Sequence, residues 1–154
     1  MIKLSPLTEA EFEKFSQRSV SDYAENMTKC STLTMSTALS KAGQIFRRYL
    51  PHGPDTPNHH LLSIRPIYAT HAVGDIWLQV KKKDKSAFLF DIYIYPDYRG
   101  LGYAKSALLA VEGYVRTLGV STIRLHVFGH NHAARSLYGK LGYADSHVTM
   151  MKDL

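Results

Sequence analysis

The residues with the clearest chemical potential lie in one short stretch, Arg99-Gly100-Leu101-Gly102-Tyr103-Ala104. A β-prone run, Phe88 to Tyr95, precedes this stretch, and apolar residues at helical spacings of three and four follow it. The first amides of a helix have no intrahelical partner, and the helix dipole adds partial positive charge there. Because glycine lets the backbone approach an anion closely, this arrangement predicts a phosphate-binding loop.

Two common phosphate loops do not fit the stretch. A Walker A loop ends in Gly-Lys-Ser/Thr, which is absent, and a dinucleotide fingerprint needs glycine or alanine where Lys105 stands. The pattern Arg/Gln-x-x-Gly-x-Gly/Ala is met by Arg99, Gly102 and Ala104. In this the chain resembles the GNAT superfamily of N-acyltransferases, whose loop amides hold the pyrophosphate of coenzyme A. Considered alone, this motif is equally compatible with a plain turn that joins a strand to a helix and binds no cofactor.

A second stretch carries the same resemblance. Asn131 is followed by Ala134, by Leu137-Tyr138 and then by Leu141-Gly142-Tyr143, which is similar to the second motif of the family. The resemblance implies that acetyl-CoA is bound by Arg99, Gly100, Leu101, Gly102, Tyr103 and Ala104, by Asn131, and by the backbone of Ile94 and Tyr95. An N–H at that strand end would also serve as an oxyanion donor.

Tyr138 is the residue to which the resemblance assigns the role of general acid. When an amine attacks a thioester, coenzyme A leaves as a thiolate with a pKa of about 8.5, and this thiolate needs a proton. A tyrosine with a pKa of about 10 is still protonated at neutral pH and can supply one. The alternative is a core aromatic, because Tyr138 shares a helical face with Leu137 and Leu141.

The general base is left open between two residues. Asp91, Tyr93 and Tyr95 share one face of the predicted strand, and many relatives carry an acidic residue where this chain has Tyr93. Asp91 could act through a water chain, whereas His126 has the more suitable pKa. Either could instead be structural, Asp91 as a hydrogen-bond partner and His126 as a core imidazole.

Composition limits the class of protein. The 154 residues suit one domain, 1–154, and 45% hydrophobic content excludes a disordered chain. The single Cys30 allows no intrachain disulfide and, with no signal peptide or membrane-length apolar run, predicts a cytoplasmic protein. Of the net charge of +6, most lies in residues 61–154, which hold twelve Lys/Arg against seven Asp/Glu. A basic half suits a polyanionic cofactor.

The element pattern predicts an α/β (α+β) fold. We expect strands over Ile2–Leu4, His59–Arg65, Ala72–Lys81, Phe88–Tyr95, Ser121–Phe128 and Val148–Met151, and helices over Glu9–Lys29, Ser36–Leu50, Gly102–Gly119 and Asn131–Gly142. This β-α-α-β-β-β-α-β-α-β order is that of the GNAT fold. It implies a mixed, mostly antiparallel sheet of about six to seven strands with helices on both faces.

The resemblance implies an acetyl-CoA-dependent N-acetyltransferase acting directly on an amine: a small molecule, a polyamine, or a peptide or protein amino group. Tyr23, Phe46, Asp22 and Glu25 are candidates for the acceptor pocket. No metal is expected, because the histidines lack zinc-site spacing. A membrane is not expected as a partner. Nucleic acid is not expected either, since the lysines concentrate in one turn. A homodimer is left open. The alternative is a non-catalytic acyl-CoA-binding regulatory module.

Overall fold

The computed structural model describes residues 1–154 and is built around a five-stranded sheet in the order β1-β2-β3-β4-β5. The first three neighbouring pairs are antiparallel, whereas β4 and β5 run parallel because a helix crosses over between them. The strands are β1 (Ile2–Pro6), β2 (His59–Pro66), β3 (Gly74–Lys81), β4 (Ser86–Ile94) and β5 (Thr122–Leu125).

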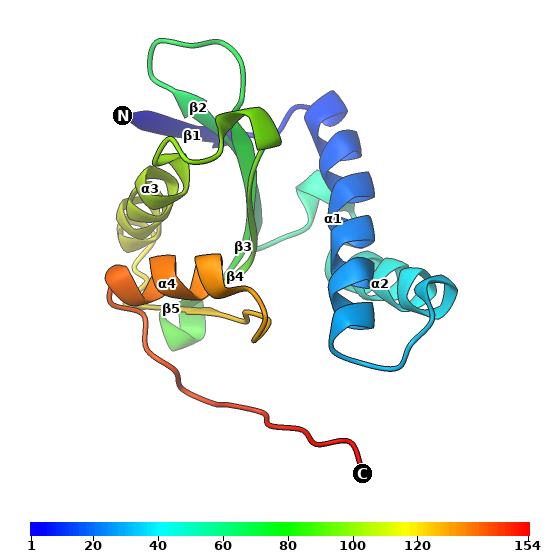
Figure 1. Ribbon diagram of the computed structural model, residues 1–154. Coiled ribbons are helices and arrows are strands. Elements are labelled where there is room, and N and C mark those ends of the chain that lie inside the picture. Colours follow the sequence, from blue (N-terminus) through cyan, green and yellow to red (C-terminus); the bar gives the residue numbers. More distant parts are fainter.

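Helices cover both faces of the sheet (Figure 1), with α1 and α2 on one face and α3 and α4 on the other. They are α1 (Glu9–Lys29), α2 (Met35–Tyr49), α3 (Tyr103–Thr117) and α4 (His132–Lys140). The predicted α+β architecture is confirmed, from the first strand through the last helix. No helix combines the length and the apolar character that crossing a membrane requires.

Local sequence signals set the helix ends. Thr8 and Glu11 form a capping box at the start of α1, each side chain accepting a hydrogen bond from the other residue's backbone N–H. The side-chain oxygen of Asn131 accepts from the N–H of Ala134 at 3.2 Å, which starts α4. After α3 the chain turns at Gly119, whose φ of 82° is a conformation that glycine adopts without strain.

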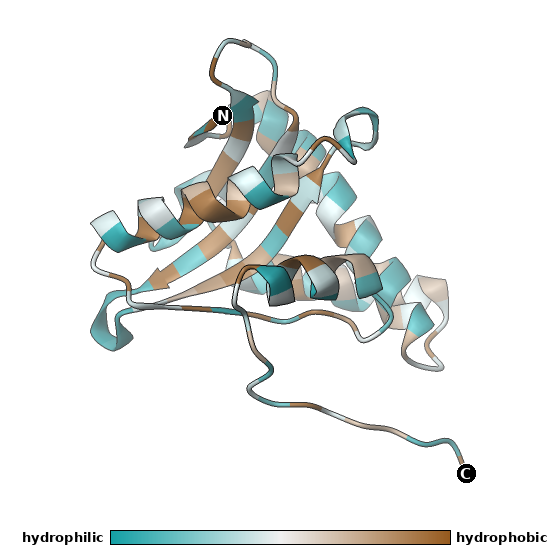
Figure 2. Ribbon diagram, turned by 60° about the vertical axis from the view of Figure 1, so that its left-hand side comes forward, coloured by the Kyte–Doolittle hydropathy of each residue, from teal (hydrophilic) through white to brown (hydrophobic).

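The larger core lies between the sheet and α3. Ile76, Leu78 and Val80 alternate along β3 and are buried against a stripe of α3 that includes Leu108 and Val111. Figure 2 shows hydrophobic residues, in brown, on the middle of α3 and on the strands behind it. Aromatic residues of α1, α2 and the other sheet face form a separate cluster around Trp77. The sheet therefore packs against a separate apolar cluster on each face. α1 belongs to one cluster and α3 to the other.

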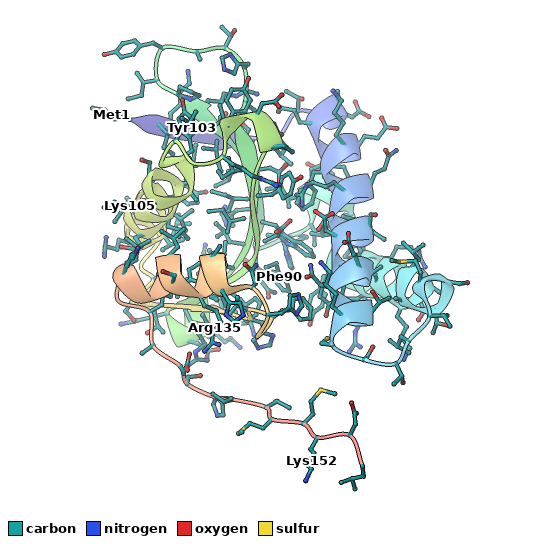
Figure 3. All side chains as sticks on the ribbon, in the orientation of Figure 1. Met1, Phe90, Tyr103, Lys105, Arg135 and Lys152 are labelled. Atoms are coloured by element: carbon teal, nitrogen blue, oxygen red, sulfur yellow. The ribbon has the colours of Figure 1, made fainter.

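One strand of this sheet contains an extra residue. Trp77 lies opposite Asp91 and Leu78 lies opposite Leu89, so that Phe90 has no partner in β3. This β-bulge puts Phe90 and Asp91 on the same face, toward α1, where the Phe90 ring stacks on Trp77 at 4.4 Å (Figure 3). Beyond the bulge, Ile92 returns to the main core. The prediction that Asp91 and Tyr93 share one face of this strand is thus confirmed, because both contact Arg18 of α1.

The expected strand count is wrong. The sheet has five strands, because the predicted strand Val148–Met151 is an extended segment without a partner. A strand forms only where a neighbour accepts its N–H groups, and the chain after α4 runs away from the sheet (Figure 1). The strand expected over Ser121–Phe128 is also shorter, Thr122–Leu125, because its partner β4 bulges immediately beyond Leu89.

Gly74 gives a stability test of the β3–β4 contact. A Cβ atom built there would lie 2.2 Å from the backbone oxygen of Tyr93, which cannot move without distorting β4. We expect Gly74→Ala to lower the free energy of unfolding by at least about 2 kcal/mol, measured by urea denaturation. The matched control is Gly113→Ala, at an exposed position of α3 with open space around it, which should raise stability by about 0.5–1 kcal/mol. Equal effects would contradict the proposed backbone contact.

Candidate active site

The sheet opens between β4 and β5. Their parallel pairing runs from Ser86 with Thr122 to Leu89 with Leu125 and stops there, at the bulge. From this point β4 continues along β3, while the chain after β5 turns across toward α1. There the ring nitrogen of His130 lies 2.9 Å from the side-chain oxygen of Asn26. The second half of β4 therefore has no strand on this side, which leaves a gap between it and the chain after β5.

Free backbone groups face this gap. The N–H of Tyr95 donates to the carbonyl of Val73 at 2.9 Å. This bond establishes which residues of β4 direct their N–H and carbonyl groups toward β3, because alternate residues of a strand do so. Tyr93 and Tyr95 therefore direct their backbone groups toward β3, whereas Ile92 and Ile94 direct theirs toward the gap. The carbonyl of Tyr95 is also taken, by the N–H of Tyr98. The backbone role predicted for Tyr95 is thus not available, and Ile92 and Ile94 are the residues that can pair with a ligand.

The loop after β4 presents a row of unpaired amides. The six consecutive N–H groups from Gly100 to Lys105 donate to no acceptor in the protein. Gly100 and Gly102 have φ values of 75° and 82°, in the left-handed region, and a Cβ on either would meet nothing within 4 Å. Tyr103 and Lys105 lie on the first turn of α3 (Figure 3). Convergent N–H groups at a helix start form an anion site.

Arg99 connects this loop to the gap. Its Nε donates to the carbonyl of Ile94 at 3.0 Å, and its guanidinium lies 5.0 Å from the centre of the Tyr93 ring. The predicted anion loop and the predicted strand end are therefore brought together. All the loop residues expected to bind a cofactor, Arg99 to Ala104, lie in one continuous turn next to Ile94.

A cleft of about 470 Å³ lies between α1, the second half of β4 and the start of α4. It is lined by Asp22, Glu25, Asn26, Lys29, Asp91, Ile92, Tyr93, Ile94, Arg99, Asn131 and Ala133. Two of the expected acceptor-pocket residues, Asp22 and Glu25, are thus at the cleft. Phe46 is not, because it packs in the aromatic cluster around Trp77, and the ring of Tyr23 lies against Phe128.

Arg18 of α1 is the centre of a charged network beneath this cleft. Its guanidinium lies 2.5 Å from Asp75, 3.0 Å from Asp91 and 3.2 Å from Asp22. Its carbon Cζ also lies 3.9 Å from the centre of the Tyr93 ring, a cation–π contact. Burial raises the pKa of Asp75 to about 6, although the nearby Arg18 acts against this increase. Burial raises the pKa of Asp91 in the same way, again opposed by Arg18.

The two candidate bases differ in their positions. Asp91 lines the cleft, and its Oδ2 atom is held by Arg18. His126 does not line the cleft; it is exposed, and its ring packs edge-on against Phe88 with 5.0 Å between the ring centres.

Tyr138 lies on the inner face of α4, partly buried against the main core. Its ring centre is 5.5 Å from that of Tyr143. Burial raises the pKa of Tyr138 to about 12, and the negative charge of Asp91 contributes to the increase. The hydroxyl is therefore protonated at neutral pH and lies within electrostatic reach of the cleft. Asn131 lines the cleft while its oxygen caps α4, which leaves its amide nitrogen free to donate.

Arg18 and Asp75 were not predicted as site residues. A local signal for Arg18 did exist: the arginine stands on the inward stripe of a helix, three residues after Phe15 and four before Asp22. An arginine at such a position becomes buried on folding and therefore needs a carboxylate as a partner. Asp75 had no local signal, because its partner lies 57 residues away in the sequence.

The fold and the opened sheet are those expected for the GNAT fold, and comparison with known proteins agrees. A family model described as the acetyltransferase (GNAT) family matches residues 47–143. The Bacillus subtilis (strain 168) protein named "Uncharacterized N-acetyltransferase YycN" is 36% identical, over 99% of both chains. The chain therefore belongs to the GNAT acetyltransferase family.

Other comparisons cover almost the whole chain. The B. subtilis protein named "Uncharacterized N-acetyltransferase YdgE" is 35% identical over 98% of this chain and 97% of its own. The crystal structure of YycN superposes with a TM-score of 0.95, covering 100% of this chain and 99% of that one. PaiA N-acetyltransferase from Thermoplasma acidophilum, solved in complex with coenzyme A, has a TM-score of 0.68 at 18% identity, covering 97% of this chain and 93% of its own. This last likeness is one of fold.

Proposed function

We propose that this protein is an acetyl-CoA-dependent N-acetyltransferase formed by one domain over residues 1–154. It passes the acetyl group directly to an amine. The observation that carries the proposal is the row of six unpaired N–H groups beside the gap between β4 and β5. A pyrophosphate fits the first feature and an extended pantetheine arm fits the second, and coenzyme A joins the two groups covalently.

In the proposed complex, the amides from Gly100 to Lys105 hold the pyrophosphate. The pantetheine amides pair with the N–H of Ile94 and the carbonyl of Ile92, like an added strand, because the carbonyl of Ile94 already accepts from Arg99. The free amide nitrogen of Asn131 donates to the same arm. The N–H of Ile92, at the end of this edge that lies farther from the loop, then serves as the oxyanion donor for the thioester carbonyl in place of Tyr95.

The amine enters from the cleft on the α1 side, where Asp22 and Glu25 attract a cationic group. It must lose a proton to attack the thioester carbon, and Asp91 takes that proton directly or through a water chain. Burial makes Asp91 a stronger base than an ordinary aspartate, while Arg18 fixes its orientation. The tetrahedral intermediate then expels the thiolate, and the Tyr138 hydroxyl gives it a proton.

A panel of amines with acetyl-CoA, followed by release of free thiol and by the mass of the product, tests this function. Small amines, polyamines and peptide amines should be included, and at least one should give an acetylated product. The alternative is a regulatory module that binds acyl-CoA without reaction. It requires saturable binding of acetyl-CoA together with no thiol release from any acceptor class.

The first prediction concerns the anion loop. Gly102→Val places a side chain where the pyrophosphate has to approach, so the affinity for acetyl-CoA should fall at least about tenfold, or about 1.4 kcal/mol. Gly119→Val is the matched control, because Gly119 has the same φ of 82° and is equally open but lies at the other end of α3. Calorimetric titration of both folded variants with acetyl-CoA measures the two affinities. Equal affinities in the two would exclude the loop from the binding site.

The second prediction concerns the general acid. Tyr138→Phe keeps the ring packing and removes the proton donor, so kcat should fall by roughly a factor of 10² to 10⁴ while the Kd for acetyl-CoA stays unchanged. Tyr143→Phe is the control, because its ring is a direct neighbour and its hydroxyl bonds to nothing in the protein. If Tyr138→Phe retains a third or more of the parent kcat, Tyr138 is only a core residue.

The third prediction concerns the base. Activity should rise with pH as Asp91 loses its proton, at a pH above the ordinary aspartate range because burial raises its pKa. Asp91→Asn should reduce kcat at least about a hundredfold. His126→Asn should keep the rising limb of the pH profile. Loss of that limb in His126→Asn would instead assign the proton to His126. A limb that persists in both variants would mean that it reports the ionisation of the amine.

A further inference from the structure

Asp75 of β3 is a buried charge that takes no part in the proposed proton transfers. Its side chain is 3% exposed, whereas that of Asp91 is 27% exposed and lines the cleft. Asp75 lies opposite Tyr93 in the β3–β4 ladder, so both side chains project toward α1. A carboxylate loses its hydration when it is buried this deeply, and it therefore needs a partner. Asp75 is thus a candidate for a role in the neighbouring site.

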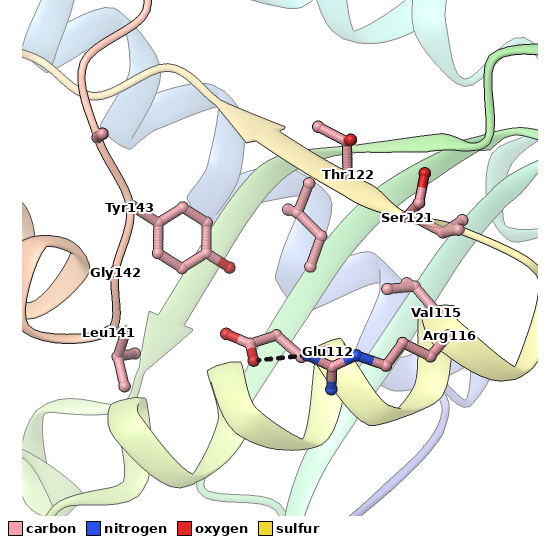
Figure 4. Close-up of a pocket in the computed structure, with 11 residues that line it drawn as sticks. Glu112, Val115, Arg116, Ser121, Thr122, Leu141, Gly142 and Tyr143 are labelled. Carbon is pink, nitrogen blue, oxygen red and sulfur yellow. Dashed lines mark ion pairs between the residues drawn. The ribbon is translucent and has the colours of Figure 1, made fainter.

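Buried charge distinguishes the network around Arg18 from a second hollow of the molecule. That hollow, of about 350 Å³, lies between α3 and β5 and contains one ion pair, Glu112 with Arg116 (Figure 4). The Arg116 side chain is 68% exposed, so water screens the pair. The Arg18 side chain is 17% exposed and contacts three carboxylates. Electrostatic effects are therefore stronger around Arg18 than in this hollow.

Asp75 and Asp91 share one nitrogen atom of Arg18. The Nη2 atom lies 2.5 Å from Oδ1 of Asp75 and 3.0 Å from Oδ2 of Asp91, so the contact with Asp75 is the shorter one. The Nη1 atom lies 3.2 Å from the more exposed Asp22, and the Nε atom is buried and bonds to nothing. Arg18 therefore makes no bidentate contact with Asp91, and only part of its positive charge compensates that carboxylate.

This sharing affects the strength of Asp91 as a base. An arginine that contacts one aspartate alone stabilises the ionised form and lowers its pKa by about 1–3 pH units, which makes the aspartate a weaker base. A second carboxylate on the same nitrogen acts in the opposite direction, because two negative charges then compete for one positive charge. Burial raises the pKa of Asp91, and Arg18 opposes the increase. A stronger hold of Arg18 on Asp91 would cancel more of this increase.

No other group around Asp75 replaces Arg18 as its cation. From β4, Tyr95 faces it as a neutral phenol, since burial raises the pKa of Tyr95 to about 12 and the charge of Asp75 adds to the increase. From β2, the residue opposite Asp75 is the uncharged Ser63. The next charged groups on β2 and α1, Arg65 and Glu11, form an ion pair with each other. The charge of Asp75 therefore acts on Arg18.

We propose that Asp75 is a positioning residue that keeps Asp91 basic by drawing the positive charge of Arg18 toward β3. The inference rests on the proposed function, in which Asp91 accepts the proton of the amine. Because burial raises the pKa of Asp75 to about 6, Asp75 gains a proton below that pH and leaves Arg18 to Asp91. Asp91 is then a weaker base. Acetyl transfer thus needs both carboxylates in the ionised form, although only Asp91 meets the amine.

The pH dependence of kcat in Asp75→Asn tests this role. Asparagine keeps the size of the side chain and removes its charge, so Arg18 should hold Asp91 more closely and lower its pKa. The rising limb of the profile should move to lower pH by at least about one unit, and kcat above the limb should fall roughly three- to tenfold. Ser63→Ala is the matched control, because it disturbs the same buried layer opposite Asp75 without changing a charge. Its rising limb should stay in place.

A titration without turnover separates this proposal from the proposed function. Carbon-13 signals of labelled aspartate carboxyl groups report the pKa of Asp91, whose signal is the one lost in Asp91→Asn. That pKa should fall by at least about one unit in Asp75→Asn and stay unchanged in Ser63→Ala. An unchanged pKa in Asp75→Asn would overturn the proposal. A lower pKa with the rising limb in its parental position would support the effect of Asp75 on Asp91 and refute Asp91 as the base.

The parent protein provides a test that does not depend on the folding of any variant. Two carboxylates that share one cation titrate as a coupled pair, so each signal follows both ionisations. The Asp91 signal of the parent should therefore show an inflection near pH 6, where Asp75 ionises, in addition to its own. An Asp91 signal that follows a single ionisation would overturn the proposal.

Discussion

The structure depends on the point at which β4 and β5 stop pairing. One extra residue, Phe90, shifts the register of β4 against β3, and the parallel ladder to β5 ends one residue earlier, at Leu89. From there the backbone groups of Ile92 and Ile94 have no strand to bond, although they lie in the middle of a sheet. Unpaired groups inside a sheet are costly, and in the proposed complex a ligand of extended shape pairs with them. The free amides of Gly100–Lys105 follow this edge in the chain, so one chain-like ligand would satisfy both sets of donors.

The same bulge explains the charged network. By placing two consecutive residues on one face, it directs Asp91 toward α1, where Arg18 holds it together with Asp75. Burial is the main cause that raises the pKa of Asp75 to about 6, and the negative charge of Asp91 adds to the increase. Three carboxylates around one guanidinium thus leave a surplus of negative charge under the cleft, which is costly to maintain. A cationic acceptor would reduce that cost on binding. Arg18 thus has two effects: it compensates the charge of the carboxylates around it, and it holds Asp91, the proposed base, in one orientation.

Much of the fold and part of the site could be predicted from local patterns. The capping box at Thr8, the helix start at Asn131 and the glycine turn at Gly100 and Gly102 depend on neighbouring residues only, and they are found as expected. The features that could not be predicted depend on distant partners. Arg18 and Asp75 are 57 residues apart in the sequence but form an ion pair. The N–H of Tyr95 donates to Val73 because of the register between β4 and β3. Val148–Met151 has the sequence of a strand but no neighbouring strand to pair with. Each of these is decided by tertiary contacts that sequence spacing does not contain.

The most direct test of this account is to observe the amides themselves. In a titration of the isotopically labelled protein with coenzyme A, followed by the amide resonances, the largest shifts should fall on Gly100–Lys105 and on Ile92 and Ile94. Gly119, which has the same backbone conformation at the far end of α3, should not shift. Such a pattern would show the loop and the opened strand holding one ligand together. Saturable binding of coenzyme A that leaves the resonances of Ile92 and Ile94 unmoved would contradict the central claim that the bulged strand is the cofactor's binding edge.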